Sequence, residues 1–235
     1  MSGDGEAMLG LLSELAASGV DRAVVMIRHG AREFVPGRHD LENPLTDAGR
    51  AAARAFGGAL PVGYEVRGYA SPVERCKETA SLVLAGYQDG GGATTRVRPM
   101  EGLGVFYTLD QMKMYRIMQA AGGLGAFLEE WTSGKLGEDV MLHADLAARA
   151  IARLMRDKLL SGTSADAQAR SPRKRGGLEL LVSHDMTLGL LRHQLLGQTW
   201  TDVGQVAFLD GVAVFARDNA VWIASPHGEP RQLPV

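Results

Sequence analysis

The chain has little of the features that would place it in a specialised class of protein. A single cysteine in 235 residues excludes an internal disulfide and indicates a reducing, cytoplasmic setting. That residue, Cys76, is interpreted as a small buried residue rather than a reactive thiol. The acidic residues 1–6 do not fit a secretory signal, which needs basic residues there. The apolar pattern at residues 8–17 is far shorter than the ~20 residues of a membrane span, so we expect no membrane partner.

Charge gives no indication of a partner macromolecule. The net charge is -2 and 22% of the residues are charged, which is too little positive excess to predict a nucleic-acid partner. The basic run at residues 170–175 lies between polar and glycine-rich stretches, and we interpret it as a solvated loop. With 46% hydrophobic residues the chain can bury one substantial core, so we predict a single domain over residues 1–235. A monomer and a homodimer are both open.

Apolar runs with strand character alternate with amphipathic stretches through most of the chain. Strands are predicted at residues 23–27, 66–70, 94–98 and 178–182, and helices at residues 8–17, 46–59, 71–84 and 186–196. This alternation predicts an α/β fold of three layers, with a mostly parallel central sheet flanked by helices. Thr46 or Asp47 is expected to cap the helix at residues 46–59. Ser71 is expected to cap the next helix, with Pro72 at its first position.

Two parts of the chain depart from this alternation. Three successive helical patterns, at residues 109–121, 125–132 and 142–160, predict a helical insertion over about residues 101–160 that forms a cap beside the sheet. Near the end, residues 205–216 and 220–225 have strand character and flank a hairpin signal at residues 217–219. The last two strands are therefore predicted to be antiparallel.

The most informative feature is a pair of histidines that each follow a predicted buried strand. His29 and His184 should both lie at the C-terminal tips of parallel strands, which is where open α/β sheets bind ligands. Three arginines, Arg28, Arg32 and Arg75, are expected at the same rim, because each follows or ends one of these strands. Two imidazoles and three guanidiniums at one edge of a sheet indicate phosphate chemistry.

These residue types suit the transfer of a phosphoryl group. Guanidiniums bind phosphate oxygens two at a time and stay charged at any working pH. A histidine nucleophile must be neutral, and neighbouring guanidiniums favour that form because they repel a proton. His29 can then carry the phosphoryl group while His184 contacts it from the opposite side. Asp185 is placed to protonate the leaving oxygen and later to deprotonate water, or it only caps the following helix. The scheme needs no metal and no cofactor.

Four short motifs occur together in the order and spacing of a known family. They are Arg28-His29-Gly30, Pro-Leu-Thr-Asp-Ala-Gly at residues 44–49, the run that begins Ser-Pro-Val-Glu-Arg at residues 71–80, and His184-Asp185. The chain resembles the histidine phosphatase superfamily, also called the phosphoglycerate mutase-like or histidine acid phosphatase fold, over most of its length. The resemblance implies that His29 is the phosphorylated nucleophile and Asp185 the proton donor. It also implies a phosphate pocket made of Arg28, Arg32, Arg75 and His184.

The resemblance is divided between two branches of that family. Arg32, and an aspartate directly after the second histidine, resemble the acid-phosphatase branch. Phe34 departs from the proline that is common there in that branch, and the short chain without disulfide cysteines resembles the mutase-like branch. The mutase-like branch takes its proton donor from a glutamate elsewhere in the chain. We favour Asp185 as the donor, and Glu101 is the alternative.

The sequence therefore predicts an enzyme, a metal-independent phosphoric monoester hydrolase that acts on a small phosphorylated molecule. A phosphomutase or phosphotransferase of the same fold, and an inactive member that only binds a phosphorylated ligand, are the alternatives. Phe34 and His39 follow the nucleophile on a loop and are candidates for the substrate mouth. Because the donor must be protonated at one step, activity is expected to be higher under mildly acidic conditions.

Overall fold

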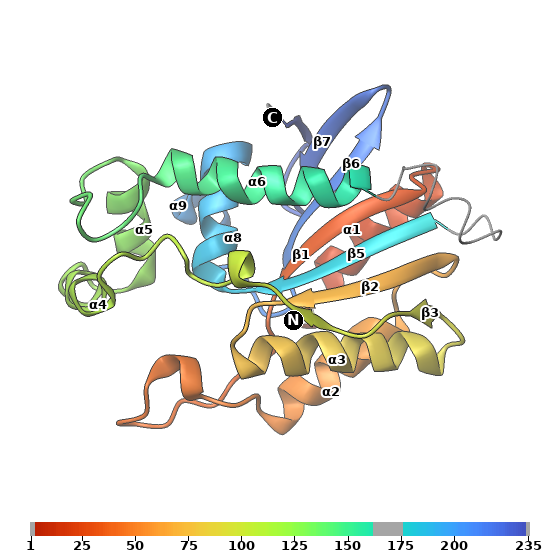
Figure 1. Ribbon diagram of the computed structural model, residues 1–235, viewed down its shortest axis with the longest axis horizontal. Coiled ribbons are helices and arrows are strands. Elements are labelled where there is room, and N and C mark those ends of the chain that lie inside the picture. Colours follow the sequence, from red (N-terminus) through yellow and green to blue (C-terminus); the bar gives the residue numbers. More distant parts are fainter. Residues whose placement is uncertain (1–2, 162–175, 234–235) are drawn as a thin grey trace.

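A mixed β-sheet runs through the centre of the molecule (Figure 1). The computed structural model describes residues 3–161 and 176–233. Within these residues the sheet has eight strands in the order β3-β2-β5-β1-β6-β7-β8, with β4 also paired to β2. The strands are β1 (Arg22–Arg28), β2 (Tyr64–Ala70), β3 (Ala93–Thr94), β4 (Arg98–Pro99), β5 (Gly176–Ser183), β6 (Gly211–Arg217), β7 (Ala220–Ala224) and β8 (Arg231–Gln232). The sheet and its flanking helices confirm the predicted fold class.

The two strands that lead into the histidines lie next to each other in the middle of the sheet. β5 pairs in parallel with both β1 and β2, and Arg28 is opposite Ser183 in the register of β1 and β5. On the other side of β1 the sheet becomes antiparallel through β6, β7 and β8. The tips of β1 and β5 therefore end side by side, which brings together the residues that follow them, His29 and His184.

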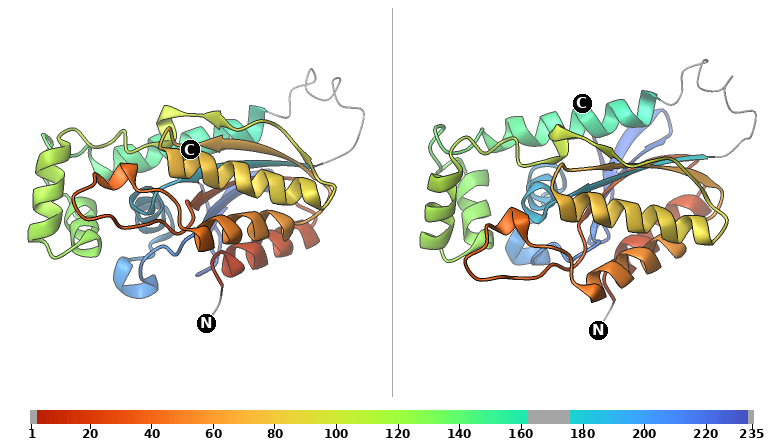
Figure 2. Two further views of the ribbon diagram at one scale, coloured as in Figure 1. Left: turned by 90° about the horizontal axis from the view of Figure 1, so that it is seen from below. Right: turned by 60° about the horizontal axis from the view of Figure 1, so that its bottom comes forward.

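Helices cover both faces of the sheet (Figures 1 and 2). α1 (Glu6–Ala17), α2 (Asp47–Gly58) and α3 (Glu74–Asp89) pack on one face, and α6 (Ala144–Ser161) and α8 (Asp185–Leu191) pack on the other. Val25 and Ile27 of β1 point to the first face, and Val24 and Met26 to the second. All four are 0% exposed. Burial on both faces explains why this strand is a continuous apolar run in the sequence.

The C-terminal ends of β1, β2 and β5 point toward the end of the molecule that carries the remaining helices (Figure 1). α4 (Gln111–Ala120) and α5 (Leu124–Thr132) lie there, and the loop of residues 33–43, with its 3-10 turn η1 (Asp40–Glu42), lies on the same side (Figure 2). The other short helical segments of the described residues are η2 (Glu101–Leu103), the π-helical turn η3 (Arg192–Leu196) and α9 (Trp200–Val203). Within the described residues, a helix of the length and apolar character needed to cross a bilayer is absent.

Most of the predicted elements form where the sequence indicated. The helices predicted at residues 8–17, 46–59, 109–121, 125–132 and 142–160 correspond to α1, α2, α4, α5 and α6. Thr46 rather than Asp47 caps α2, because its hydroxyl accepts a hydrogen bond from the amide of Gly49. β6 and β7 form the predicted hairpin, with Asp218 and Asn219 at φ values of 52° and 59° in the turn. The extent of the single domain and of the insertion at residues 101–160 stay predictions.

Two predicted boundaries were wrong because a side chain of the site replaces a local interaction. Ser71 does not cap α3, which begins at Glu74 with Val73 in the capping position. The hydroxyl of Ser71 lies 2.9 Å from Nε2 of His184, and it also accepts the amide hydrogen of Val73 at 3.4 Å. Residues 205–210 are not part of a strand, since β6 begins only after them, and the carbonyl oxygens in this segment accept hydrogen bonds from Arg28.

Two further predicted elements differ from the structure in their extent. The strand predicted at residues 94–98 is divided into β3 and β4, two short strands that each pair with β2. The helix predicted at residues 186–196 begins one residue earlier, as α8, and ends in the π-helical turn η3. The basic run at residues 170–175 lies outside the described residues.

Candidate active site

His29 lies at the tip of β1 with its ring enclosed by protein, and the residue is 1% exposed. Its Nδ1 is 2.8 Å from the carbonyl oxygen of Gly30, and its Nε2 is 3.0 Å from Nε of Arg75. A carbonyl can only accept a hydrogen bond and a guanidinium can only donate one, so we assign the proton to Nδ1 and the lone pair to Nε2. Nε2 is therefore the nucleophilic atom of this ring, and it faces a cation.

His184 follows β5 and lies against His29. The ring centroids are 5.7 Å apart and the rings are inclined at 70°. Nε2 of His184 is 2.9 Å from the hydroxyl of Ser71, and the sulfur of Cys76 is 3.8 Å from the same nitrogen. Ser71, Cys76 and His184 are all buried. The strand order thus places both histidines and the segment after β2 in one enclosed cluster.

Burial keeps both imidazoles neutral near pH 7. It lowers the pKa of His29 well below the usual 6.5, and the charge of Arg75 acts in the same direction. The same two causes, burial first, lower the pKa of His184 to about 4. Burial also raises the pKa of the Cys76 thiol to about 12, against the opposing charge of Arg75. The positive charge of the cluster therefore comes from its arginines, and Cys76 stays an uncharged buried thiol.

Arg28, the last residue of β1, is held from three directions. Its Nη2 pairs with Oδ2 of Asp185 at 2.8 Å, and its Nη1 donates to the carbonyl oxygen of Val206 at 2.7 Å. The ring of Phe208 lies 4.1 Å from the guanidinium carbon, in the geometry of a cation–π contact. The amide of Leu209, a residue with a φ of 61°, donates to the carbonyl oxygen of Arg28. This segment fixes the position of the guanidinium of Arg28, and no motif in the sequence indicates these contacts.

Arg75 and Arg32 meet at the carboxylate of Asp40. Oδ1 of Asp40 is 2.6 Å from Nη2 of Arg32, and its Oδ2 is 3.2 Å from Nη2 of Arg75. The backbone carbonyl of Asp40 also accepts a hydrogen bond from Nη1 of Arg75 at 2.7 Å. Arg75 is 3% exposed, whereas Arg32 is half-buried. Asp40 is not among the predicted site residues, because a lone aspartate in a polar loop carries no signal of the side chains that it contacts.

Two of the family motifs hold the backbone around the nucleophile. The hydroxyl of Thr79 accepts a hydrogen bond from the amide of Gly30 at 3.1 Å and donates to the carbonyl oxygen of Arg75 at 2.7 Å. Gly49 packs so closely against Ala31 that a Cβ at position 49 would lie 2.2 Å from the carbonyl oxygen of Ala31. The glycine and the threonine of these motifs are therefore required by close packing around the end of β1.

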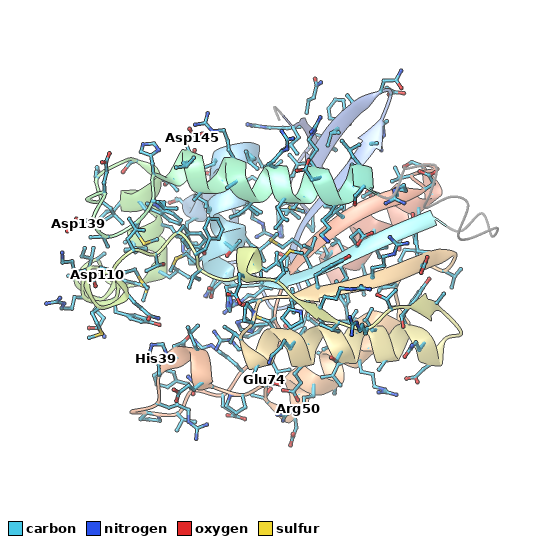
Figure 3. All side chains as sticks on the ribbon, in the orientation of Figure 1. His39, Arg50, Glu74, Asp110, Asp139 and Asp145 are labelled. Carbon is cyan, nitrogen blue, oxygen red and sulfur yellow. The ribbon has the colours of Figure 1, made fainter. Side chains whose placement is uncertain are left out.

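Three of the predicted site residues lie around the cluster rather than in it. Phe34 is 76% exposed on the loop. His39 precedes η1, and its ring lies 5.9 Å from that of Tyr115 in α4 (Figure 3). Glu101 begins η2 and is exposed, and within the described residues its carboxylate makes no hydrogen bond or ion pair. η2 nevertheless adjoins the cluster, because the carbonyl oxygen of Leu103 accepts a hydrogen bond from Ser183 at the end of β5.

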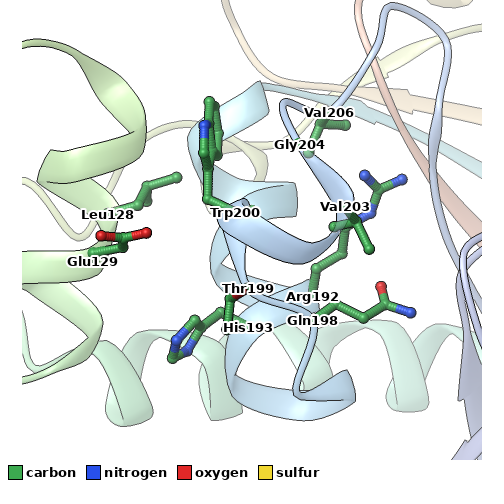
Figure 4. A pocket seen from close by; sticks show the side chains of 11 residues that line it. Leu128, Glu129, Arg192, His193, Gln198, Thr199, Trp200, Val203, Gly204 and Val206 are labelled. Carbon is green, nitrogen blue, oxygen red and sulfur yellow. The ribbon is translucent and has the colours of Figure 1, made fainter.

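A separate pocket lies between α5, η3 and α9 (Figure 4). Its lining includes Glu129, Arg192, Trp200 and Val206, and none of the predicted site residues. Val206 connects it to the support of Arg28, and Arg192 is paired in the interior with Asp210 at 2.7 Å. This pocket therefore adjoins the segment that holds Arg28 and is not part of the cluster.

The resemblance indicated by the motifs is tested by comparing the whole chain with the sequence patterns of known families. The pattern of the histidine phosphatase superfamily (branch 1) matches residues 24–214, which include both histidines, the three arginines and Asp185. The chain belongs to this superfamily. The match is to branch 1, and the acid-phosphatase character indicated by Arg32 and Asp185 stays a prediction.

Solved structures share the fold of this histidine phosphatase superfamily member. Phosphoglycerate mutase from Bacillus anthracis is 18% identical, and the alignment covers 86% of this chain and 91% of that one with a TM-score of 0.55. Mycobacterial glucosyl-3-phosphoglycerate phosphatase is 18% identical over 90% of this chain and 96% of that one, with a TM-score of 0.53. A phosphoserine phosphatase mutant from Entamoeba histolytica, in complex with phosphoserine, is 17% identical over 87% and 95%, with a TM-score of 0.51. A search of curated proteins found no match.

The cluster suits a tetrahedral anion. It combines a neutral imidazole whose Nε2 carries a lone pair with guanidiniums that approach from the tip of β1 and from the start of α3. Within residues 3–161 and 176–233, a group of three or more His, Cys, Asp or Glu side chains that could hold a metal ion is absent. The superfamily includes phosphatases and mutases, so the arrangement is compatible with phosphoryl transfer to water or to another acceptor.

Proposed function

We propose that this protein hydrolyses a small phosphomonoester, without a metal, through a phosphohistidine on His29. The observation that carries the proposal is the state of that ring: a buried, neutral imidazole whose Nε2 faces the guanidinium of Arg75 at 3.0 Å. A phosphoryl dianion bound by Arg75 and Arg28 would bring phosphorus next to this lone pair. His184, with its ring centroid 5.7 Å from that of His29, would contact the group from the opposite side.

In the first half-reaction, Nε2 of His29 forms a bond to phosphorus and the bond from phosphorus to the ester oxygen breaks. Arg75 must turn its Nε–H from Nε2 to a phosphate oxygen, which frees the lone pair. The charge that develops on the equatorial oxygens is stabilised by the guanidiniums of Arg28, Arg32 and Arg75. A carboxylic acid gives its proton to the leaving oxygen, so the alcohol departs uncharged.

In the second half-reaction, water attacks phosphorus and the bond from phosphorus to Nε2 breaks. The proton of the water passes to the carboxylate that lost one in the first half, and orthophosphate is released. The acid and the neutral ring of His29 are thereby both restored. The low pKa of His29 helps here, because a ring that resists protonation returns to the form with a free lone pair.

We propose Asp185 as the proton donor, and Glu101 is the alternative. Oδ2 of Asp185 is held by Arg28 at 2.8 Å and its Oδ1 accepts the amide hydrogen of Met186 at 2.9 Å. When Arg28 turns to a phosphate oxygen, Asp185 is released beside the leaving group. Within residues 3–161 and 176–233 the carboxylate of Glu101 has no partner to lose, but Glu101 is exposed on η2 and would have to swing toward the cluster.

The test of the function is turnover of p-nitrophenyl phosphate with a chelator present. We expect His29→Ala to abolish turnover and His143→Ala, which removes a histidine outside the cluster, to retain it. Quenching with ³²P-labelled substrate should leave label on the wild-type protein that is stable in base and lost in acid. Unchanged turnover by His29→Ala would refute the proposal. Transfer of label to an added alcohol rather than to water would favour the transferase, and binding of ligand without label on His29 would favour the inactive alternative.

The proton donor is identified by comparing leaving groups. A nitrophenolate departs without a proton, whereas a phenolate or an alkoxide needs one, so loss of the donor slows the poorer leaving group more. Asp185→Asn is expected to slow phenyl phosphate by a much larger factor than p-nitrophenyl phosphate, and Glu101→Gln to slow both equally little. The reverse pattern would assign the role to Glu101.

A further inference from the structure

We propose that the carboxylate of Asp40 occupies the place of the substrate's phosphate in the free protein, and that phosphate binding displaces it together with the tip of the loop of residues 33–43. The nature of the competing anion rests on the proposed function. The contacts that would be displaced are two ion pairs of the structure, those of Asp40 with Arg32 and with Arg75.

Asp40 makes the contacts that two oxygens of a phosphate would make. One carboxylate oxygen lies 2.6 Å from Arg32 and the other lies 3.2 Å from Arg75. Arg75 also donates to Nε2 of His29 at 3.0 Å, so a single guanidinium separates the carboxylate from the nucleophilic atom. Carboxylate and phosphate use the same N–H groups of arginine. The two anions therefore compete for one site.

The loop is built so that its tip can move while its base stays in place. At the base, the amide of Glu33 donates to the carbonyl oxygen of Pro44 at 2.8 Å, and residues 32 and 45 form a β-bridge. The tip, residues 34–39, is exposed throughout. The tip and the adjoining Asp40 are joined to their surroundings by few contacts. These are the contacts of Asp40 with the two arginines, the ring contact of His39 with Tyr115, and the hydrogen bond from the amide of Val35 to Oδ1 of Asn43 at 3.2 Å. Segments with so few buried contacts open at low cost in free energy.

Charge and exposure decide which anion prevails. The side chain of Asp40 is 32% exposed and that of Arg32 is 22% exposed, so their ion pair is partly screened by water. A phosphate monoester carries two negative charges, whereas the carboxylate of Asp40 carries one. Phosphate should therefore displace the carboxylate, but at a cost that lowers its measured affinity. We expect that cost to weaken phosphate binding by about tenfold.

The test measures the affinity of the ligand-free protein for orthophosphate by isothermal titration calorimetry. Asp40→Asn removes the competing charge and keeps the backbone carbonyl that Arg75 contacts. Glu42→Gln is the matched control, because it removes the same charge from an exposed position of the same turn. Asp40→Asn should bind orthophosphate about tenfold more tightly than the wild type, and Glu42→Gln should stay within about twofold of it.

Equal or weaker binding by Asp40→Asn would overturn the proposal, because Asp40 would then only position the arginines. An equal gain in orthophosphate affinity in Glu42→Gln would also overturn it, because the effect would then come from the net charge of the protein and not from the position of Asp40. Asp40→Ser serves the same comparison should the asparagine variant fail to fold. If neither the wild type nor any variant binds orthophosphate, both the phosphate site and the proposed function are refuted. If all of them bind it equally, only the proposed role of Asp40 is refuted.

A second readout follows the loop directly by hydrogen exchange. The amide of Glu42 donates to His39 and that of Asn43 donates to Asp40, so both amides are protected while the tip is docked. Orthophosphate should accelerate their exchange, although a ligand usually slows exchange near its site. Slower exchange of these amides with orthophosphate would show that the loop closes over the anion, contrary to the proposal.

Discussion

The buried histidines predict that the ligand-free protein loses stability between pH 7 and pH 5. An unfolded histidine has a pKa near 6.5, whereas burial and Arg75 lower the pKa of His184 to about 4 in the folded protein. The unfolded chain therefore binds a proton in this range that the folded chain does not bind. The contribution is fully present above pH 6.5 and is lost as the pH falls toward 4. At pH 5 the loss from His184 alone is about 2 kcal/mol relative to pH 7.

The assay is urea unfolding, followed by tryptophan fluorescence, at pH 7 and at pH 5. In His184→Gln, whose amide can still bond to Ser71, the decrease in the free energy of unfolding between the two pH values should be smaller than in the wild type by about 2 kcal/mol. His29→Gln should act in the same direction, because the pKa of His29 is lowered too. His143→Gln, outside the cluster, should keep the wild-type decrease. The reasoning is wrong if His184→Gln shows the full wild-type decrease, since the ring would then titrate alike in both states.

Three further predictions address single residues of the cluster. Arg75→Lys should lower kcat/KM for an aryl phosphate by about 10²–10³, because lysine lacks the two parallel N–H donors that hold a phosphate and the Nε–H that contacts His29. A decrease of less than about tenfold would contradict this role of Arg75. Thr79→Val should lower the free energy of unfolding, measured in urea, by about 1–3 kcal/mol, because the buried amide of Gly30 loses its hydrogen-bond acceptor. An unchanged midpoint of urea unfolding would argue against that hydrogen bond. Cys76 should resist alkylation by iodoacetamide at pH 8 in the native protein and react fully in urea, because burial raises the pKa of its thiol to about 12. Mass spectrometry measures the alkylated fraction. Rapid alkylation of the native protein would mean that the thiol is accessible.

The centre of the fold could be predicted because burial on both faces leaves a strong signal in the sequence. β1 is apolar at residues 23–27 and β5 at residues 178 and 180–182, and both runs predict strands with a histidine shortly after them. The errors lie where side chains bond to the backbone or to distant residues. Residues 205–210 have the composition of a strand, but they wrap around Arg28 instead, and the sequence of this segment alone does not contain that long-range contact.

The site was predictable where chemistry and strand ends coincide. His29 and His184 lie together because parallel neighbours end at the same edge, and Arg28 is fixed by its place as the last residue of β1. Ser71 was recognised as part of a motif but was assigned to helix capping, because serine before proline is a common helix start. Its actual partner, His184, comes from the far end of the chain. Local patterns thus identified the residues of the cluster better than the contacts among them.

The need for counter-charges explains why Asp185 and Asp40 occur where they do. Arg28 and Arg75 are 6% and 3% exposed, and a guanidinium that deeply buried is stable only with acceptors for its N–H groups. In the free protein the acceptors are carboxylates, Asp185 for Arg28 and Asp40 for Arg75. The sequence reveals the cations, and electrostatics requires anions near them, but only the fold selects which carboxylates serve. Under the proposed function the same two carboxylates give way to a phosphate, so a residue that neutralises a buried arginine is also one that substrate binding sets free. In the case of Asp185, this would place a carboxyl group beside the leaving oxygen.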